Sequence, residues 1–438
     1  MGAKYVVFVE EMLVAGSTQM IAANVGLGVG RTPMAPPLSV AQELALRRTV
    51  LSSLASTLVG QPAGGAIGAH GAAMAMAEAP AVLPAPAAAA VEKVQILEGI
   101  SAIVIDDDSV DVASLHGVHG LTVVENIELR LPDPVVFAAA VAPPVDWHLT
   151  TIGLTSGLAG GKDILVGVLD TGIDAAHAEF AGKKIHFAEF DPIGRNISSV
   201  PRDAGDHGTH VSSIATGARA GVAPDADLAV AAVLTTRGAD GRMSGSLVQI
   251  VNGFNWLVTT QFRQGVPGVD VINASLGGTG FNAYLQPAVR TAFSVGVPLI
   301  AAIGNSGRAG PDLHGSPGNY PEALGIGASD VADVVAEFSD WGISGPPTGP
   351  AGPNYPVPDF CAPGVLVQAA RPGGGFQPMS GTSMATPVVT GVAARRMALT
   401  PALVGKPAAL FTDLRSRLAP CTPHAPGGNL GGAGRIIA

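Results

Sequence analysis

The 438-residue chain is poor in cysteine, in charged residues and in aromatic side chains. Its two cysteines, Cys361 and Cys421, permit at most one disulfide and form no CxxC or Cys/His pattern, which excludes a disulfide scaffold and a zinc motif. Because the net charge is −10 and Lys and Arg are scattered, nucleic acid is not expected as a partner. Charged residues make up 13% and apolar residues 47%, which indicates a large buried core rather than a disordered chain.

A recognisable signal peptide is also missing. Residues 1–11 lack a basic start, an apolar segment and a small-residue cleavage site, so we expect the chain as given to stay in the cytoplasm or to be exported by another route. An uncharged stretch lies between Arg48 and Glu78. Because it contains Pro62 and its later half is rich in Gly and Ala, we interpret it as a helix end plus a linker. No membrane partner is expected, and a membrane span is the minor alternative.

Glycine and proline are abundant, at 58 and 35, and their distribution divides the chain into two parts. Residues 1–136 predict a small α/β sandwich, with a Gly/Ala/Pro-rich linker at about 60–90 and a strand–strand–helix–strand pattern at 91–127. In residues 137–438, apolar strands alternate with helices, which predicts an α/β domain with a mainly parallel sheet and helices on both faces. The expected strands of this domain are 164–169, 228–233, 269–274 and 298–303, and the expected helices start at 207, 246 and about 284.

Four polar residues stand in glycine-containing segments where strands end or helices begin: Asp170, His207, Asn305 and Ser383. Each alone has an ordinary explanation as a turn or cap residue. Together they supply an orienting acid, a base, a nucleophile and an amide that can stabilise an oxyanion. A second histidine, His210, has no carboxylate at the spacing of a metal motif, so we expect no metal site there and interpret it as a packed residue.

These residues lie in segments that resemble the signatures of the subtilisin family of serine peptidases, the subtilases: Asp170-Thr171-Gly172, His207-Gly208-Thr209-His210 and Gly381-Thr382-Ser383-Met384-Ala385-Thr386-Pro387. The resemblance implies a subtilisin-like α/β fold and a serine endopeptidase with no required cofactor. It implies that Ser383 attacks the scissile carbonyl, that His207 transfers the proton and that Asp170 orients the imidazole. Asn305 and the backbone N–H of Ser383 are implied to bind the oxyanion, with Thr382 as a further candidate.

The resemblance also places the substrate, which is expected to be a peptide or protein. Ser275-Leu276-Gly277 resembles the strand that pairs with an extended peptide substrate. His314-Gly315-Ser316-Pro317 resembles the far wall of the pocket for P1, the residue on the amino side of the cut bond, and Gly304 beside Asn305 is expected to line it. Because Gly315 leaves the floor open and Ser306 is uncharged, we expect a preference for large apolar P1 residues.

The N-terminal part resembles the propeptide of the same family, which is a ferredoxin-like sandwich. The resemblance implies that residues 1–136 act as an intramolecular inhibitor of the catalytic domain. It also implies that the chain cuts itself in the Pro/Ala-rich stretch between Leu131 and Asp146, as a zymogen does.

The chain departs from the family after His207, where residues 216–224 directly join a helix to a strand. The family usually has a long calcium-binding loop there, so its tight calcium site is not expected. The sequence leaves open whether calcium binds at another position, because oxygen ligands have no fixed spacing outside motifs.

Two alternative functions stay open. The long segment 11–90 and the missing signal peptide are compatible with a narrow-specificity maturation protease for a peptide or signalling precursor. The other alternative is a non-catalytic binding module on the same scaffold, which the complete triad and Asn305 disfavour.

Overall fold

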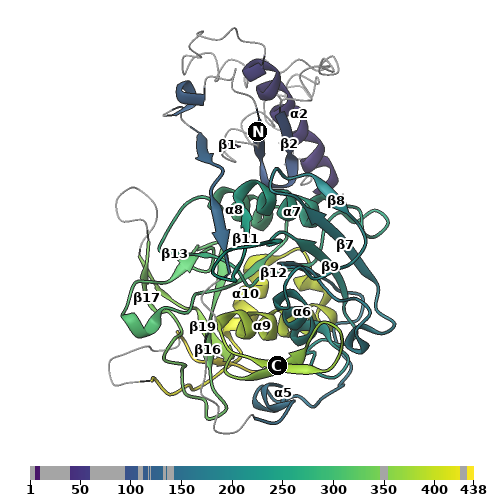
Figure 1. Cartoon of the computed structure of the whole chain (residues 1–438), viewed down its shortest axis with the longest axis vertical. Helices are drawn as coiled ribbons and strands as arrows, with labels where there is room; N and C mark the ends of the chain where they lie inside the picture. Colours follow the sequence, from purple (N-terminus) through teal and green to yellow (C-terminus); the bar gives the residue numbers. More distant parts are fainter. Residues whose placement is uncertain are drawn as a thin grey trace, which may run out of the picture.

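A computed structural model describes residues 5–9, 40–59, 94–106, 112–116, 118, 120–131, 135, 143–345, 354–424 and 432–438. These residues form a small N-terminal sheet that sits on a larger domain (Figure 1). The predicted linker at about 60–90 and most of the stretch between Leu131 and Pro143 lie outside the described residues.

A ten-stranded sheet forms the centre of the larger domain, in the order β22-β23-β19-β16-β14-β12-β6-β9-β7-β8. Its inner strands are parallel, and antiparallel pairs join β22 to β23 and β8 to β7 at the two edges. The strand bounds are β6 Leu165–Asp170, β7 Ile185–Phe190, β8 Asn196–Ser198, β9 Asp227–Ala232, β12 Val271–Ala274, β14 Leu299–Ala302, β16 Ala323–Ser329, β19 Phe360–Pro363, β22 Leu418–Ala419 and β23 Arg435–Ile436. The mainly parallel sheet predicted from the apolar segments is confirmed.

Helices cover both faces of this sheet, as predicted. Successive side chains of β6 point to opposite faces, so that Val166 and Val168 pack in one core while Leu165 and Leu169 pack in another. The first core contains α6, α9 and α10, and the second contains α7 and α8. Their bounds are α6 His207–Thr216, α7 Leu247–Thr259, α8 Gln286–Ser294, α9 Thr382–Leu399 and α10 Pro407–Arg415, with a short α5 at Trp147–Thr151.

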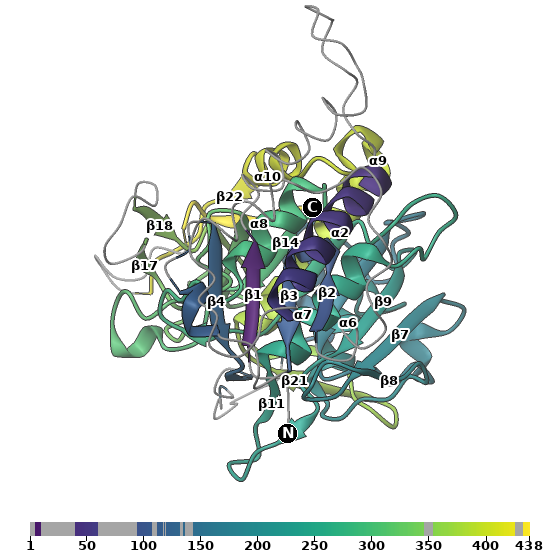
Figure 2. The same ribbon diagram turned by 90° about the horizontal axis from the view of Figure 1, so that it is seen from above.

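The N-terminal sheet is antiparallel, in the order β2-β3-β1-β4, and α2 lies across one of its faces (Figure 2). Its elements are β1 Tyr5–Val9, α2 Val40–Val59, β2 Val94–Leu97, β3 Ala102–Ile105, the short helix η2 Val112–Leu115 and β4 Leu121–Glu125. The other face packs on α7 and α8, because Phe8 and Ile100 share a core with Phe254 and Val289. Between β2 and β3 lies a short helix, η1 Glu98–Ile100, whose Gly99 N–H donates to Asn255 Oδ1 at 2.8 Å.

A short strand that the sequence did not predict connects the two parts. This strand, β5 Glu128–Arg130, pairs with β11 Met243–Ser246 in a sheet of order β10-β11-β5, where β10 is Thr236–Arg237. Three two-stranded antiparallel sheets complete the larger domain: β13 Gly278–Thr279 with β15 Gly315–Ser316, β17 Gly342–Ser344 with β18 Tyr355–Val357, and β20 Val367–Ala370 with β21 Phe376–Met379.

Of the helices in the described part of the chain, none has both the length and the apolar character that a membrane crossing needs. Cys361 and Cys421 are free thiols, and Cys361 is buried in β19.

Candidate active site

Asp170 and His207 come from separate elements and meet at the carboxyl end of β6. Asp170 is the last residue of β6 and is fully buried, and His207 is the first residue of α6. The Nδ1 atom of His207 lies 2.8 Å from Asp170 Oδ1 and 2.9 Å from Oδ2. Burial lowers the pKa of His207, but the charge of Asp170 and its hydrogen bond outweigh burial, so the pKa is raised overall. Because Nδ1 faces the carboxylate, Nε2 is the nitrogen that can take up a proton.

Ser383 lies in the first turn of α9 and is 4% exposed. Its hydroxyl donates to the backbone oxygen of Ser275 at 3.3 Å rather than to the ring of His207. Hydrogen bonds between a nucleophile and its base often form fully only when substrate binds, so this geometry is compatible with a catalytic pair.

Buried hydrogen bonds fix α9 against β12 next to Ser383. The hydroxyl of Ser275 donates to the backbone oxygen of Ser383 at 2.9 Å. Asn273 Nδ2 donates to that hydroxyl at 3.0 Å, and the hydroxyl of Thr390 donates to Asn273 Oδ1 at 3.0 Å. Because a buried polar group without a partner is costly, this chain of bonds holds the start of α9 in one position.

Asn305 follows β14, and its amide is oriented by Thr382. Asn305 Oδ1 accepts the backbone N–H of Thr382 at 2.9 Å and the Thr382 hydroxyl at 2.9 Å. Since an N–H group requires an acceptor, these bonds place the amide oxygen toward Thr382 and leave Nδ2 to donate elsewhere. Thr382, the further candidate for the oxyanion site, therefore contacts the predicted oxyanion donor Asn305 through both its N–H and its hydroxyl.

A cavity of about 390 Å³ brings the predicted catalytic groups together. His207, Asn305 and Ser383 line it, together with Leu131 and Val135 from the end of the N-terminal part. A reacting carbonyl in this cavity would therefore meet a nucleophile, a base and an amide donor, which is the set of groups that acyl transfer needs.

The surroundings of His210 and of the segment after α6 can be described from the contacts of their polar side chains. His210 is buried, burial lowers its pKa to about 3, and its Nε2 contacts the backbone oxygen of Gln377 at 3.0 Å. Residues 217–226 connect α6 directly to β9, and their one acidic residue, Asp225, accepts the N–H of Gly160 at 2.8 Å. Within the described ranges no group of three or more His, Cys, Asp or Glu residues could hold a metal ion.

A second pocket, of about 260 Å³, lies beside the cavity. Four of the five predicted substrate-binding residues line it, namely Leu276, Gly277, Gly304 and Gly315. The fifth, Ser275, is fully buried and contacts Ser383 instead.

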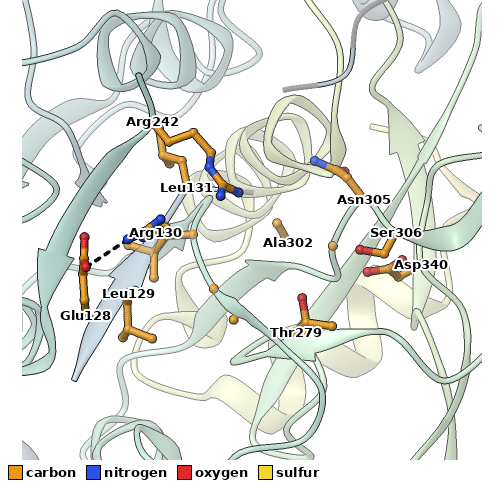
Figure 3. Close-up of a pocket in the computed structure, with 15 residues that line it drawn as sticks. Glu128, Leu129, Arg130, Leu131, Arg242, Thr279, Ala302, Asn305, Ser306 and Asp340 are labelled. Atoms are coloured by element: carbon orange, nitrogen blue, oxygen red, sulfur yellow. Dashed lines mark hydrogen bonds and ion pairs between the residues drawn. The ribbon is translucent and has the colours of Figure 1, made fainter. Parts of the chain in front are cut away.

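The expectation of an uncharged P1 pocket is corrected by Asp340, which lines this pocket and is 2% exposed. Figure 3 shows its carboxyl group beside Ser306, on the side opposite to β5. Local sequence gives no signal for this residue, because Asp340 is 35 positions from Asn305 and stands in the unremarkable segment Ser339-Asp340-Trp341.

The chain's own strand β5 occupies the edge at which a peptide substrate was predicted to pair. Arg130 forms an antiparallel bridge with Gly277, and the N–H of Leu131 donates to the backbone oxygen of Met243 at 2.9 Å. Leu129, Arg130 and Leu131 line the second pocket (Figure 3), and Leu129 is 8% exposed. An extended segment of this chain therefore lies between β11 and Gly277, which is in the segment that joins β12 to β13.

Comparisons with known proteins identify the family of the larger domain. The family model described as "Subtilase family" matches residues 161–413. Subtilisin-like serine protease Pen ch 13 of Penicillium rubens is 36% identical over 255 residues, which are 58% of this chain and 57% of that protein. Subtilisin-like protease 1 of Trichophyton verrucosum is 37% identical over 241 residues, which are 55% of this chain and 54% of that protein. The chain thus spans little more than half the length of these curated relatives.

Two solved structures are similar in fold. The structure titled "Sphericase" has a TM-score of 0.58 and 28% identity, and covers 68% of this chain and 99% of its own. The structure of a cold adapted subtilisin-like serine proteinase has a TM-score of 0.52 and 28% identity, and covers 65% of this chain and 96% of its own. Both support the α/β architecture of the larger domain.

Proposed function

The chain belongs to the subtilase family, and on this premise we propose that it is a serine endopeptidase that hydrolyses peptide bonds in peptide or protein substrates. The observation that carries the proposal is the bond of His207 Nδ1 to both carboxylate oxygens of Asp170, at 2.8 and 2.9 Å, in a cavity that also contains Ser383 and Asn305.

In the proposed reaction, Ser383 Oγ attacks the scissile carbonyl while His207 Nε2 takes up the hydroxyl proton. Asp170 keeps the imidazole in the tautomer with the proton on Nδ1 and stabilises the imidazolium. The oxyanion accepts hydrogen bonds from Asn305 Nδ2 and from the backbone N–H of Ser383 at the start of α9. His207 then protonates the leaving amine, which leaves an acyl-enzyme that water hydrolyses by the same steps in reverse.

We further propose that the chain is a zymogen whose N-terminal part inhibits the larger domain. The antiparallel bridge of Arg130 to Gly277 supports this, because a substrate is expected to pair with the same strand. The packing of η1 on α7 and α8 supports it too, since it anchors the inhibitory segment. A cut between Leu131 and Asp146 would separate the two parts and allow the segment to leave.

Labelling with a fluorophosphonate probe tests the proposed nucleophile. We expect the processed wild-type chain to be labelled at Ser383, because His207 and the oxyanion donors activate that hydroxyl alone. The Ser380→Ala variant is a matched control three residues away and should be labelled as wild type. Absence of labelling in wild type would contradict the proposal and favour the non-catalytic binding module.

In the pH profile of kcat/KM, the decrease on the acid side (the acid limb) is expected to follow the protonation of His207. The base must be neutral, so activity is present above its pKa and is lost as the pH falls through it. Since Asp170 raises that pKa, the limb should lie above 6.5 for an uncharged peptide substrate. Asp206→Asn should move the limb slightly downward, because the charge of Asp206 also raises this pKa. A limb at or below 6.5 in wild type would contradict this assignment.

A further inference from the structure

The floor of the pocket beside the catalytic cavity contains a buried carboxyl group. Asp340 is 2% exposed and lines this pocket together with Gly304, Ser306 and Gly315. Gly304 has a φ of +117°, and a Cβ built on it would lie 2.1 Å from Asp340 Oδ2. The carboxyl group therefore packs directly on the backbone that leads to Asn305.

Hydrogen bonding of Asp340 is incomplete. Its carboxylate accepts the backbone N–H of Ser306, and its own N–H donates to the Gly304 oxygen at 3.0 Å. Oδ1 is buried and has no hydrogen-bond partner among the described residues. A buried carboxylate oxygen without a partner is costly, so the group is poised to accept a donor.

The other charged groups of the pocket are paired with one another. Arg130 contacts Glu128 and Asp240, both at 3.2 Å, and Arg242 contacts Asp240 at 2.8 Å. These side chains come from β5 and the β10–β11 hairpin, on the side opposite to Asp340 (Figure 3). The carboxyl group of Asp340 therefore faces a pocket whose two arginines already have carboxylate partners.

We propose that Asp340 determines P1 specificity, by pairing with the cationic end of a P1 lysine or arginine. The methylene stem of such a side chain would lie along the walls formed by Leu276 and Ala302, and its cationic end would reach the floor. The proposed preference for a positive charge replaces the predicted preference for large apolar P1 residues, and the two predict opposite P1 profiles. This inference rests on the proposed peptidase function.

The titration of Asp340 agrees with this role. Burial raises its pKa to about 7, because the ionised carboxylate loses its hydration in the pocket. A cation that entered the pocket would favour the ionised form and lower that pKa. Above pH 7 the free enzyme would therefore contain a buried anion that substrate binding neutralises.

The test compares tetrapeptide substrates that differ only at P1, which is lysine or its uncharged analogue norleucine. The full-length chain is expressed and allowed to process; because residues 131–146 contain no Lys or Arg, this first cut relies on tethering within the molecule rather than on P1 preference. The kcat/KM of the processed enzyme is then measured above the pKa of Asp340. We expect wild type to favour lysine by about tenfold or more. When norleucine binds, the buried carboxylate of Asp340 has no partner, and this raises the free energy of the complex. Asp340→Asn should lower kcat/KM for lysine by about tenfold or more and leave norleucine within about threefold.

The asparagine variant separates specificity from support of the Asn305 loop, because its amide oxygen can still accept the Ser306 N–H. Asp312→Asn is the matched control; it removes a negative charge outside the pocket and should leave the lysine-to-norleucine ratio unchanged. A wild-type ratio of one or less overturns the inference even if Asp340→Asn does not fold. An equal loss for both substrates in Asp340→Asn also overturns it and indicates a supporting role. If neither substrate is cut and fluorophosphonate does not label wild type, the proposed function itself fails.

Discussion

The Ser383→Ala variant is expected to remain at full length, whereas the wild-type chain shortens to a fragment that begins between about Val135 and Asp146. The variant keeps the cavity and the bound β5 segment but has no hydroxyl to attack the scissile carbonyl. Loss of the nucleophile of a triad lowers kcat by on the order of 10⁶-fold, a magnitude taken from such a replacement in a subtilisin. Gel mobility and N-terminal sequencing of the two purified chains provide the measurement.

A matched control and a mixing experiment complete this test. Ser416→Ala removes an exposed hydroxyl that donates to Asp413 at the end of α10, and this variant should process as wild type. Addition of processed wild type to Ser383→Ala reveals whether the cut can occur between molecules. If both chains stay intact, self-processing is wrong, although hydrolysis of other substrates could still be measured.

The Asp170→Asn variant should lose about 10⁴-fold in kcat, by analogy with the same replacement in other serine-protease triads. Asparagine fits the buried site, but its amide NH₂ replaces one acceptor oxygen and can donate to an unprotonated Nδ1. The imidazole would then adopt the wrong tautomer, with Nε2 protonated and unable to take the Ser383 proton. Steady-state hydrolysis of one peptide substrate by wild type and variant measures the loss.

The control for this loss is Asp225→Asn, which neutralises a carboxylate that accepts the Gly160 N–H away from the cavity. It should retain wild-type kcat. A decrease of less than tenfold in Asp170→Asn would mean that Asp170 does not orient the base. Circular dichroism of the variant separates this outcome from a failure to fold.

The strands and helices of the larger domain could be predicted because their signals are local. Strand β6 is an apolar run that is buried on both faces, and α7 begins with a capping box in which Ser246 and Gln249 exchange hydrogen bonds. The catalytic motifs follow such elements directly, so the sequence also indicated where Asp170, His207 and Ser383 would lie.

The remaining features depend on contacts between residues far apart in the chain, which local patterns do not encode. Strand β5 is a three-residue segment whose extended form depends on β11 and Gly277, more than a hundred residues later. Asp340 looks like an ordinary surface residue in the sequence, and its position in the pocket follows from the packing of its loop on Gly304. The bond of the Thr382 hydroxyl to Asn305 could not be predicted for the same reason, because the two residues are 77 positions apart.

The continuity of the chain through β5 also affects how strongly the cleft is blocked. In the proposed zymogen, the segment joined to the N-terminal sheet would compete with a substrate as a tethered ligand, at an effective concentration on the order of millimolar. After a cut beyond Leu131, the same contacts become an equilibrium between two molecules, and occupancy of the cleft then depends on the total protein concentration. Dilution should therefore increase specific activity in processed samples and leave an uncut chain unchanged.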